Sequence, residues 1–354
     1  MQAQSKKGRG AATNHTGRYQ AETRENFDDG WDSLDELPEQ LPTTLNIDHA
    51  KTVISYNTSP DIPFDRSINP YRGCEHGCAY CFARPSHAYL GLSAGLDFET
   101  QLYYKPDAPE RLRAELAVRS YRPAPIALGI NTDAYQPVER KLGLTRRILE
   151  VLNEARHPVS IVTKSALIER DLDILTGMAA QGLVHVALSI TTLKPELARK
   201  LEPRAASPKR RLQTLACLAE AGIPVSLLVA PVIPVLTDEE LEKILKEARN
   251  AGALDAEYVL LRLPLELKGL FEEWLNLHEP LKAKHVLERV YDSRGGKAYD
   301  STFGIRMTGT GEYAEMLKQR FRVAMKKLLF PGMRILNVGL FKSPGQDGQT
   351  DLFS

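Results

Sequence analysis

The sequence NPYRGCEHGCAYCFAR, residues 69–84, holds three of the four cysteines of the 354-residue chain. Cys74, Cys78 and Cys81 have the spacing C-x3-C-x2-C, and Gly73 and Gly77 allow the loop to wrap around a common centre. Thiolates are the ligands that zinc ions and iron–sulfur clusters prefer. Three thiolates on a [4Fe–4S] cluster leave one iron open for chemistry, so the spacing favours a three-cysteine cluster.

Two other interpretations of the three cysteines stay open at this point. A structural zinc ion requires four ligands, so His76 or His87 would have to join the thiolates. The three thiols could also be unliganded. The fourth cysteine, Cys217, falls in a predicted helix beside Leu215 and Leu218, which indicates a core residue and not a ligand.

Short β-branched runs alternate with amphipathic stretches through most of the chain. Strands are predicted over residues 66–69, 125–130, 159–164, 184–190, 224–229 and 257–263. Helices are predicted between them, over residues 108–119, 140–155, 171–181, 209–221 and 238–251. Apolar strands separated by such helices indicate a parallel sheet covered on both faces. We therefore expect an α/β fold, a partial (β/α)6 TIM-like barrel, with an open two-sided sheet as the alternative.

The ends of the chain differ in pattern from this alternating part. We expect a flexible N-terminal arm over residues 1–45, a core over 46–265, a helical C-terminal extension over 266–341 and a flexible tail over 342–354. Within the extension, helices are predicted over residues 268–277, 281–290 and 313–329. Both tails are polar and lack periodic apolar residues, which is typical of disorder.

Charge and composition exclude several classes of protein. The 46 Lys and Arg residues nearly balance the 45 Asp and Glu residues, so the formal net charge of +1 excludes a polybasic protein that holds nucleic acid by bulk charge. No apolar run approaches the roughly 18 residues that a membrane span requires, and the N-terminus has no apolar segment typical of a secretory signal. We expect a cytoplasmic, monomeric protein with no membrane partner.

Polar residues follow three neighbouring predicted strands at their carboxyl ends. In a parallel barrel these ends meet at one rim, and that rim carries the chemistry. We therefore give weight to the following side chains at this rim: Asn131, Thr132, Asp133, Thr163, Lys164, Ser189, Thr191 and Thr192.

The cysteine motif at the end of the first predicted parallel strand resembles the radical S-adenosylmethionine (radical SAM) superfamily. Together with GINTDAYQPVE, residues 129–139, it is similar to the spore-photoproduct-lyase-like branch of that superfamily, and the similarity spans residues 65–265. The resemblance implies that Cys74, Cys78 and Cys81 hold a [4Fe–4S] cluster. It further implies that the fourth iron of that cluster binds the amino and carboxyl groups of S-adenosyl-L-methionine.

The same resemblance implies roles for further residues. Tyr80 would lie near the adenine, and Asn131, Thr132 and Asp133 stand where the family has a Gly-Gly-Glu strand end that holds the methionine amino group. Lys164 and Ser189 would meet the carboxylate and the ribose. Glu202 and Arg204 match a Glu-x-Arg element that reaches the same groups, and Val232, within residues 230–233, would belong to the apolar wall beside the adenine.

The activity implied is reductive cleavage of S-adenosylmethionine to a 5′-deoxyadenosyl radical, with an electron donor such as flavodoxin or ferredoxin. That radical would abstract hydrogen from a substrate, for which a nucleic-acid lesion or base, in the manner of a DNA repair lyase, is our first hypothesis. The alternatives are a peptide or small metabolite as substrate, or a non-catalytic iron–sulfur or zinc binding module. Spore photoproduct lyase returns a hydrogen atom from a cysteine, and only Cys217 remains here for that role.

The C-terminal tail carries a separate motif. Gln349-Thr350-Asp351-Leu352-Phe353 resembles the peptide with which bacterial proteins bind the sliding clamp, in which a Leu-Phe pair fills an apolar pocket. The resemblance implies the sliding clamp, and with it DNA, as a partner.

Overall fold

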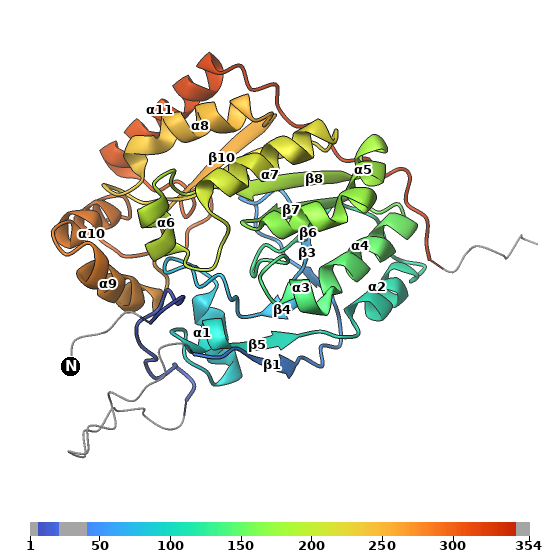
Figure 1. Ribbon diagram of the computed structural model, residues 1–354, viewed down its shortest axis with the longest axis horizontal. Helices are drawn as coiled ribbons and strands as arrows, with labels where there is room; N and C mark the ends of the chain where they lie inside the picture. The colour runs from blue at the N-terminus through green and yellow to red at the C-terminus, as the bar shows by residue number, and fades with distance from the viewer. Residues whose placement is uncertain (1–5, 21–40, 345–354) are drawn as a thin grey trace, which may run out of the picture.

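The computed structural model describes residues 6–20 and 41–344, and its centre is a seven-stranded sheet (Figure 1). The strand order is β10-β9-β8-β7-β6-β3-β2. The strands are β2 (Ile54–Tyr56), β3 (Arg66–Ile68), β6 (Ile126–Leu128), β7 (Val159–Thr163), β8 (Val184–Ser189), β9 (Val225–Val232) and β10 (Asp255–Leu260). All neighbours are parallel except β2, which pairs antiparallel with β3. Six parallel strands in chain order, with β3 and β10 unpaired to each other, confirm the predicted partial barrel.

The strands form where the sequence has apolar runs. Val186, Leu188 and Leu227 share one face of the sheet and are almost fully buried, whereas Ala187 on the opposite face is partly buried. Helices lie along the outer face in Figure 1, and they are α2 (Ala108–Leu116), α4 (Leu144–Glu154), α5 (Leu172–Ala180), α7 (Pro208–Glu220) and α8 (Leu241–Asn250). This arrangement directs the carboxyl ends of all six parallel strands to one rim.

The helix predicted over residues 140–155 is two helices. The short α3 (Glu139–Leu142) ends at Gly143, whose φ of 60° lies in the left-handed region, and α4 begins directly afterwards. A left-handed residue cannot continue an α-helix, and glycine adopts that conformation without steric cost. The change of direction brings Glu139 of α3 to the buried hydroxyl of Tyr71.

A second, small sheet was not predicted from the sequence. It has the order β1-β5-β4 and consists of β1 (Thr44–Ile47), β5 (Gln101–Tyr104) and β4 (Tyr71–Arg72), with α1 (Asp97–Thr100) beside it. Each element has at most four residues, too few to show a period. The sheet matters because β4 leads directly into the cysteine loop.

The C-terminal extension is helical, as predicted, with α9 (Leu267–His278), α10 (Ala283–Asp292) and α11 (Gly311–Lys327). Its helices pack on the core through pairs such as Tyr258 and Phe321, whose ring centroids are 4.9 Å apart. The irregular segment between α10 and α11 returns to the barrel, where the Leu260 N–H donates to the Met307 carbonyl at 2.8 Å. No helix in the described part of the chain is both long enough and apolar enough to span a membrane.

The N-terminal residues 6–20 pack against the molecule near the cysteine loop. Arg9 donates through Nη1 to the Glu99 carbonyl at 2.7 Å, and the amides of Gly10 and Ala11 donate to the Glu99 carboxylate at 3.0 and 2.8 Å. Glu99 is fully buried, so it needs these donors.

The same segment also reaches the C-terminal extension. The Thr13 hydroxyl donates to Glu273 of α9 at 2.6 Å, and Arg18 pairs with Glu266. Figure 1 shows this blue segment between α1 and α9. Residues 6–20 of the arm predicted over residues 1–45 therefore contact Glu99, Glu266 and Glu273 of the fold, and the flexibility of the arm as a whole stays a prediction.

One buried arginine organises the cysteine loop from inside. Arg84 donates to the carbonyls of Cys78 and Gly95, both at 2.9 Å, and of Gly77 at 3.2 Å. It also forms an ion pair with Glu99, and both side chains are completely buried. The loop has no regular secondary structure, so Arg84 satisfies carbonyls that would otherwise have no donor.

We predict that Arg84→Met lowers the free energy of unfolding by about 3–5 kcal/mol, because it leaves the Glu99 carboxylate buried without its cation. The matched control is Arg113→Met, which removes an exposed pair with Glu154 and should cost under about 1 kcal/mol. Urea unfolding followed by circular dichroism measures both. Equal losses in the two variants would contradict the importance given to the buried pair.

Candidate functional site

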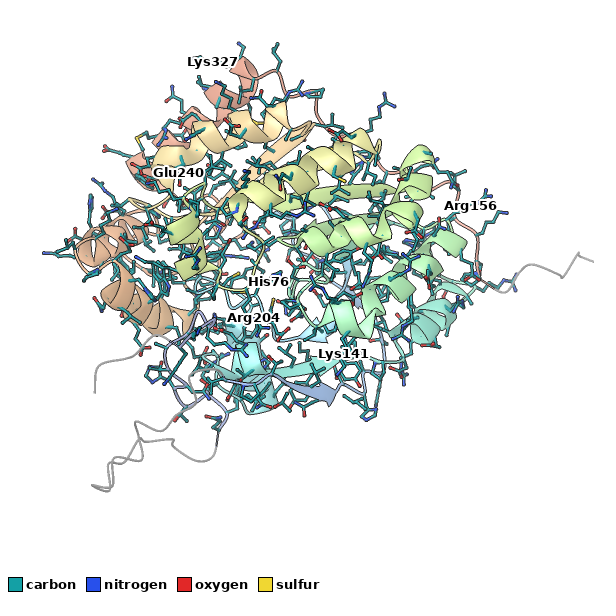
Figure 2. All side chains as sticks on the ribbon, viewed as in Figure 1. His76, Lys141, Arg156, Arg204, Glu240 and Lys327 are labelled. Carbon is teal, nitrogen blue, oxygen red and sulfur yellow. The ribbon has the colours of Figure 1, made fainter. Side chains whose placement is uncertain are left out.

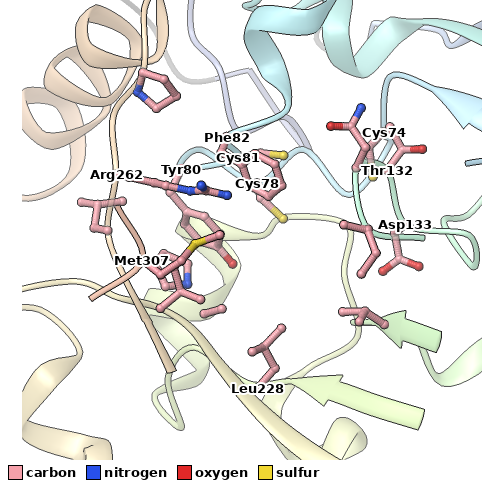
Figure 3. Close-up of a pocket in the computed structure, with 18 of the residues that line it drawn as sticks. Cys74, Cys78, Tyr80, Cys81, Phe82, Thr132, Asp133, Leu228, Arg262 and Met307 are labelled. Carbon is pink, nitrogen blue, oxygen red and sulfur yellow. The ribbon is translucent and has the colours of Figure 1, made fainter. Parts of the chain in front are cut away.

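A cavity of about 870 Å³ opens at the carboxyl-end rim of the parallel strands. One wall is the cysteine loop, a second is the ends of β6, β7 and β9, and a third comes from the residues after β10 together with the C-terminal extension. Figure 3 shows side chains from all three walls around one space. Prominent among them are Cys74, Cys78, Tyr80, Cys81, Phe82, Thr132, Asp133, Leu228, Arg262 and Met307.

The cysteine loop is shaped by its glycines and by backbone hydrogen bonds. Gly73 and Gly77 have φ values of 76° and 66°, and a Cβ on Gly77 would lie 2.6 Å from a Glu99 oxygen. The Cys74 amide donates to the Phe98 carbonyl at 2.9 Å. The local conformation therefore requires glycine at these positions, as the sequence indicated.

The three cysteines of the loop are free thiols that face the same cavity. Burial raises the pKa of Cys74 well above its ordinary value and raises that of Cys78 to about 12. A bound metal replaces the thiol proton and stabilises the thiolate, so these buried thiols suit ligation and not a role as free nucleophiles.

The donor set fits a cluster better than a single ion. In residues 6–20 and 41–344, no three His, Cys, Asp or Glu side chains converge on one ion. Of the two histidines proposed as zinc ligands, His87 does not line the cavity that the three thiols face, and His76 lies with its Nδ1 3.3 Å from Asp133. Each thiolate of a [4Fe–4S] cluster binds a different iron, so the three sulfurs need only surround a common space.

Asp133 joins the ends of two strands at the rim. Its carboxylate accepts from the Thr163 hydroxyl at 2.7 Å and from the Lys164 amide at 2.8 Å. Burial raises the pKa of Asp133, but the charge and hydrogen bond of His76 and these donors outweigh it and lower the pKa to about 2. Beside it, Asn131 and Thr132 also line the cavity, as predicted.

Lys164 places a cation at the end of β7. Its Nζ donates to the Ser189 hydroxyl at 2.8 Å and lies 5.8 Å from the centroid of the Tyr80 ring. Lys164 and Tyr80 line the cavity, whereas Ser189 lies behind Lys164 and donates to the Ala230 carbonyl at 3.2 Å. The ammonium group is therefore oriented by Ser189 toward the space next to Tyr80.

Glu202 and Arg204 lie outside the cavity lining. Glu202 is buried against Arg211 and accepts a hydrogen bond from the Tyr80 hydroxyl. Burial raises the pKa of Glu202, but the charge of Arg211 outweighs it and the pKa falls to about 2. Arg204 pairs with Glu75 at 3.2 Å. In this geometry Glu202 orients Tyr80.

Arg204 and Val232, both predicted to bind the cofactor, lie outside the cavity lining. Arg204 lies beside His76 near the centre of the molecule (Figure 2), and its amide donates to the His76 carbonyl at 3.3 Å. Val232 is buried in β9 but does not line the cavity, whereas Leu228, Ala230 and Pro231 of the same strand do.

The third wall was missed in the sequence analysis. It includes Arg262 after β10, and Tyr299 and Met307 from the segment between α10 and α11. Arg262 follows an apolar strand directly, which is a signal that could have drawn attention to it. Tyr299 and Met307 stand in an irregular segment, and no local pattern marks them.

These features agree with a comparison of the chain with known families. The family model described as "Radical SAM superfamily" matches residues 68–248, just over half of the chain. The chain belongs to the radical SAM superfamily. The resemblance drawn from the cysteine motif is therefore confirmed at the level of the superfamily.

Relatives of this radical SAM chain occur in bacteria and archaea. The uncharacterized protein Rv2578c of Mycobacterium tuberculosis is 40% identical over 221 residues, which cover 62% of this chain and 65% of that protein. The chain thus matches slightly less than two thirds of that relative. The uncharacterized protein MJ0683 of Methanocaldococcus jannaschii is 28% identical over 63% of this chain and 75% of that protein.

Solved structures show the same fold. Spore photoproduct lyase complexed with dinucleoside spore photoproduct matches with a TM-score of 0.57 and 17% identity, over 81% of this chain and 80% of that chain. At this identity the likeness establishes the fold, a partial barrel of the radical SAM type.

We predict that Glu202→Gln destabilises the protein most at neutral pH. Folding lowers the pKa of Glu202 from an ordinary 4.5 to about 2, so the wild-type carboxylate stabilises the fold above pH 4.5 and loses this effect as the pH falls toward 2. The difference in unfolding free energy between wild type and variant should therefore shrink below pH 4.5. Urea unfolding from pH 7 to pH 3 measures it, and a constant difference would contradict the assignment.

Proposed function

We propose that this radical SAM protein cleaves S-adenosylmethionine reductively and uses the resulting 5′-deoxyadenosyl radical to abstract hydrogen from a substrate in the 870 Å³ cavity. The observation that carries the proposal is the position of Cys74, Cys78 and Cys81 in the wall of a cavity at the carboxyl-end rim of a parallel sheet. A binding module that used metal only as a structural clip would not need this space.

In this proposal the residues that line the cavity have the following roles. Cys74, Cys78 and Cys81 would hold a [4Fe–4S] cluster, which when bound supplies one electron to the sulfonium of S-adenosylmethionine. Lys164, oriented by Ser189, would bind the carboxylate of the cofactor as a charge-assisted hydrogen bond. Asn131 and Thr132 would present oxygen acceptors to its ammonium group. Asp133, whose carboxylate already accepts from Thr163 and Lys164, would add a negative charge beside them.

Tyr80 and the apolar residues of β9 would bind the adenosine part. The hydroxyl of Tyr80 is held by Glu202 and by Thr191, so its ring has a fixed face beside Lys164. Leu228 and Pro231 form an apolar surface on the other side of the cavity. In this proposal Glu202 positions Tyr80 and does not contact the cofactor, because its carboxylate pairs with Arg211 and accepts a hydrogen bond from the Tyr80 hydroxyl.

For the substrate we propose a nucleic-acid lesion or base. The support is the fold shared with spore photoproduct lyase, one structure of which contains a dinucleoside spore photoproduct. The hydrogen donor must differ from a cysteine above the barrel, because Cys217 lies on α7 and does not line the cavity. A reductant such as flavodoxin or ferredoxin and a cytoplasmic location belong to the same proposal.

Sliding-clamp binding by Gln349–Phe353 remains a prediction, since this motif lies outside the described residues. It concerns delivery of the enzyme to DNA and is independent of the chemistry in the cavity.

The test is anaerobic reconstitution of the full chain with iron and sulfide, followed by dithionite and S-adenosylmethionine. We expect about four irons per chain and release of 5′-deoxyadenosine. Cys78→Ala should lose both, because the cluster then lacks one of its three protein ligands. The measurements are iron and sulfide analysis and chromatography of the nucleoside.

Cys217→Ala is the matched control, because this cysteine is distant from the cavity lining and should leave both readouts at the wild-type level. Tight binding of zinc in place of iron, or a reduced cluster that never cleaves the cofactor, would refute the proposed function. Either result would favour the binding module considered from the sequence.

A further inference from the structure

Arg262 lies in the third wall of the cavity, and the proposed function gives no role to this wall. It follows β10, and its guanidinium carbon is 4.2 Å from the centroid of the Phe82 ring, next to the last cysteine of the loop. Figure 3 shows Arg262 reaching toward Phe82 and the cysteines. This cation–π contact holds the guanidinium at the wall of the cavity, which Arg262 and Phe82 both line.

Within the described residues, Arg262 forms no ion pair with a carboxylate, unlike its neighbour. Arg306 also lines the cavity, but Asp61 holds it through contacts of 2.6 and 2.8 Å. Arg262 has the Tyr299 hydroxyl beside it, and burial is the main cause that lowers the pKa of its guanidinium. The carboxylate whose charge acts on Arg262 is Asp61, which is already paired with Arg306. Burying a cation that shares its counter-charge is costly, and an anionic ligand would offset that cost.

The backbone that carries Arg262 is held in place before any ligand binds. The buried Arg294 donates to the carbonyls of Leu260 and Leu261 at 3.0 and 3.1 Å. It also donates to the carbonyls of Ile305 and Arg306 at 3.0 and 2.8 Å. One side chain therefore ties the end of β10 to the segment between α10 and α11, so the anion position is preorganised.

Exposed apolar groups line the same cavity as this cation. Phe82 and Leu265 are 40% and 59% exposed, and Arg306, which also lines the cavity, lies 4.9 Å from the ring of the exposed Phe303. Aromatic and apolar faces next to arginines are typical of sites for unstacked nucleotides, where a base stacks and a phosphate pairs with the cation.

Of the Lys and Arg residues that line the cavity, Lys164 and Arg262 form no ion pair with a carboxylate of the described residues, and they follow different strands. Lys164 ends β7, whereas Arg262 follows β10, and β8 and β9 lie between these strands in the sheet. A single carboxylate from the cofactor can pair with one of them. The other then remains for the substrate.

We propose that Arg262 binds a phosphodiester oxygen of a nucleic-acid strand, with the adjacent base against Phe82 and Leu265. This inference rests on the proposed function and specifies its substrate as a nucleotide unit that carries a charged phosphate. Lys164 is left for the cofactor carboxylate. The assignment makes Arg262 a specificity residue for charged over uncharged ligands.

The test compares two dinucleotides that differ only in charge. Thymidylyl-(3′→5′)-thymidine and its neutral methylphosphonate analogue are titrated into the reconstituted full chain, with S-adenosylmethionine present, by isothermal calorimetry. We expect the wild type to bind the charged dinucleotide roughly tenfold or more tightly, the range of a hydrogen bond to a charged group. Arg262→Gln should remove this preference, and Arg262→Lys should retain part of it.

Arg322→Gln is the charge-matched control, because this exposed arginine on α11 does not line the cavity. It should retain the wild-type preference. A thermal melt of each variant verifies folding, and Arg262→Lys keeps the test decisive if Arg262→Gln does not fold. The preference of Arg262→Lys for the charged dinucleotide should be smaller than that of the wild type but should not vanish.

Three outcomes would overturn the inference. The wild type could bind both dinucleotides equally, or bind neither while binding a carboxylated peptide. Alternatively, Arg262→Gln could weaken binding of S-adenosylmethionine and leave the preference intact, which would assign Arg262 to the cofactor. None of these outcomes bears on the release of 5′-deoxyadenosine by the wild type. The proposed function is therefore tested separately from this inference.

Discussion

The buried ion pair between Arg84 and Glu99 is the interaction on which the site depends. The cysteine loop must turn three thiols to one side, so it cannot form a helix or strand that satisfies its own carbonyls. Arg84 supplies donors to Cys78 and Gly77 from inside the loop, and Glu99 supplies the compensating charge. Glu99 in turn binds the backbone of residues 6–20, so an N-terminal segment becomes part of the support of the loop.

The cavity has two electrostatic halves because its walls come from different parts of the chain. Next to β6 and β7, Asp133 and Lys164 offer both charges within one network, which suits a zwitterionic cofactor. Across the cavity, Arg262 presents a cation over an aromatic ring without a carboxylate partner among the described residues. In the proposed function the first half binds the cofactor, and the second half selects the substrate.

The C-terminal extension is part of the site as well as a helical cover of the core. Its helix α11 packs on α8 and, through Phe321, on Tyr258 of β10, and the segment between α10 and α11 supplies Tyr299, Arg306 and Met307 to the cavity. Arg294 fixes this segment through four backbone carbonyls. Variation in this segment could change the substrate without disturbing the cysteine loop, since the two walls are held by different buried arginines.

The sequence by itself determined the six parallel strands, the order of the helices and the identity of the cysteine wall. These features depend on local apolar runs and on residues within one loop, and both are visible along the chain. Only the tertiary structure decided that Arg211 forms an ion pair with Glu202, that Glu99 binds residues 6–20 and that Arg262 lines the cavity. Each of these depends on which charge lies next to which in a buried space, and no local pattern encodes contacts between residues distant along the chain.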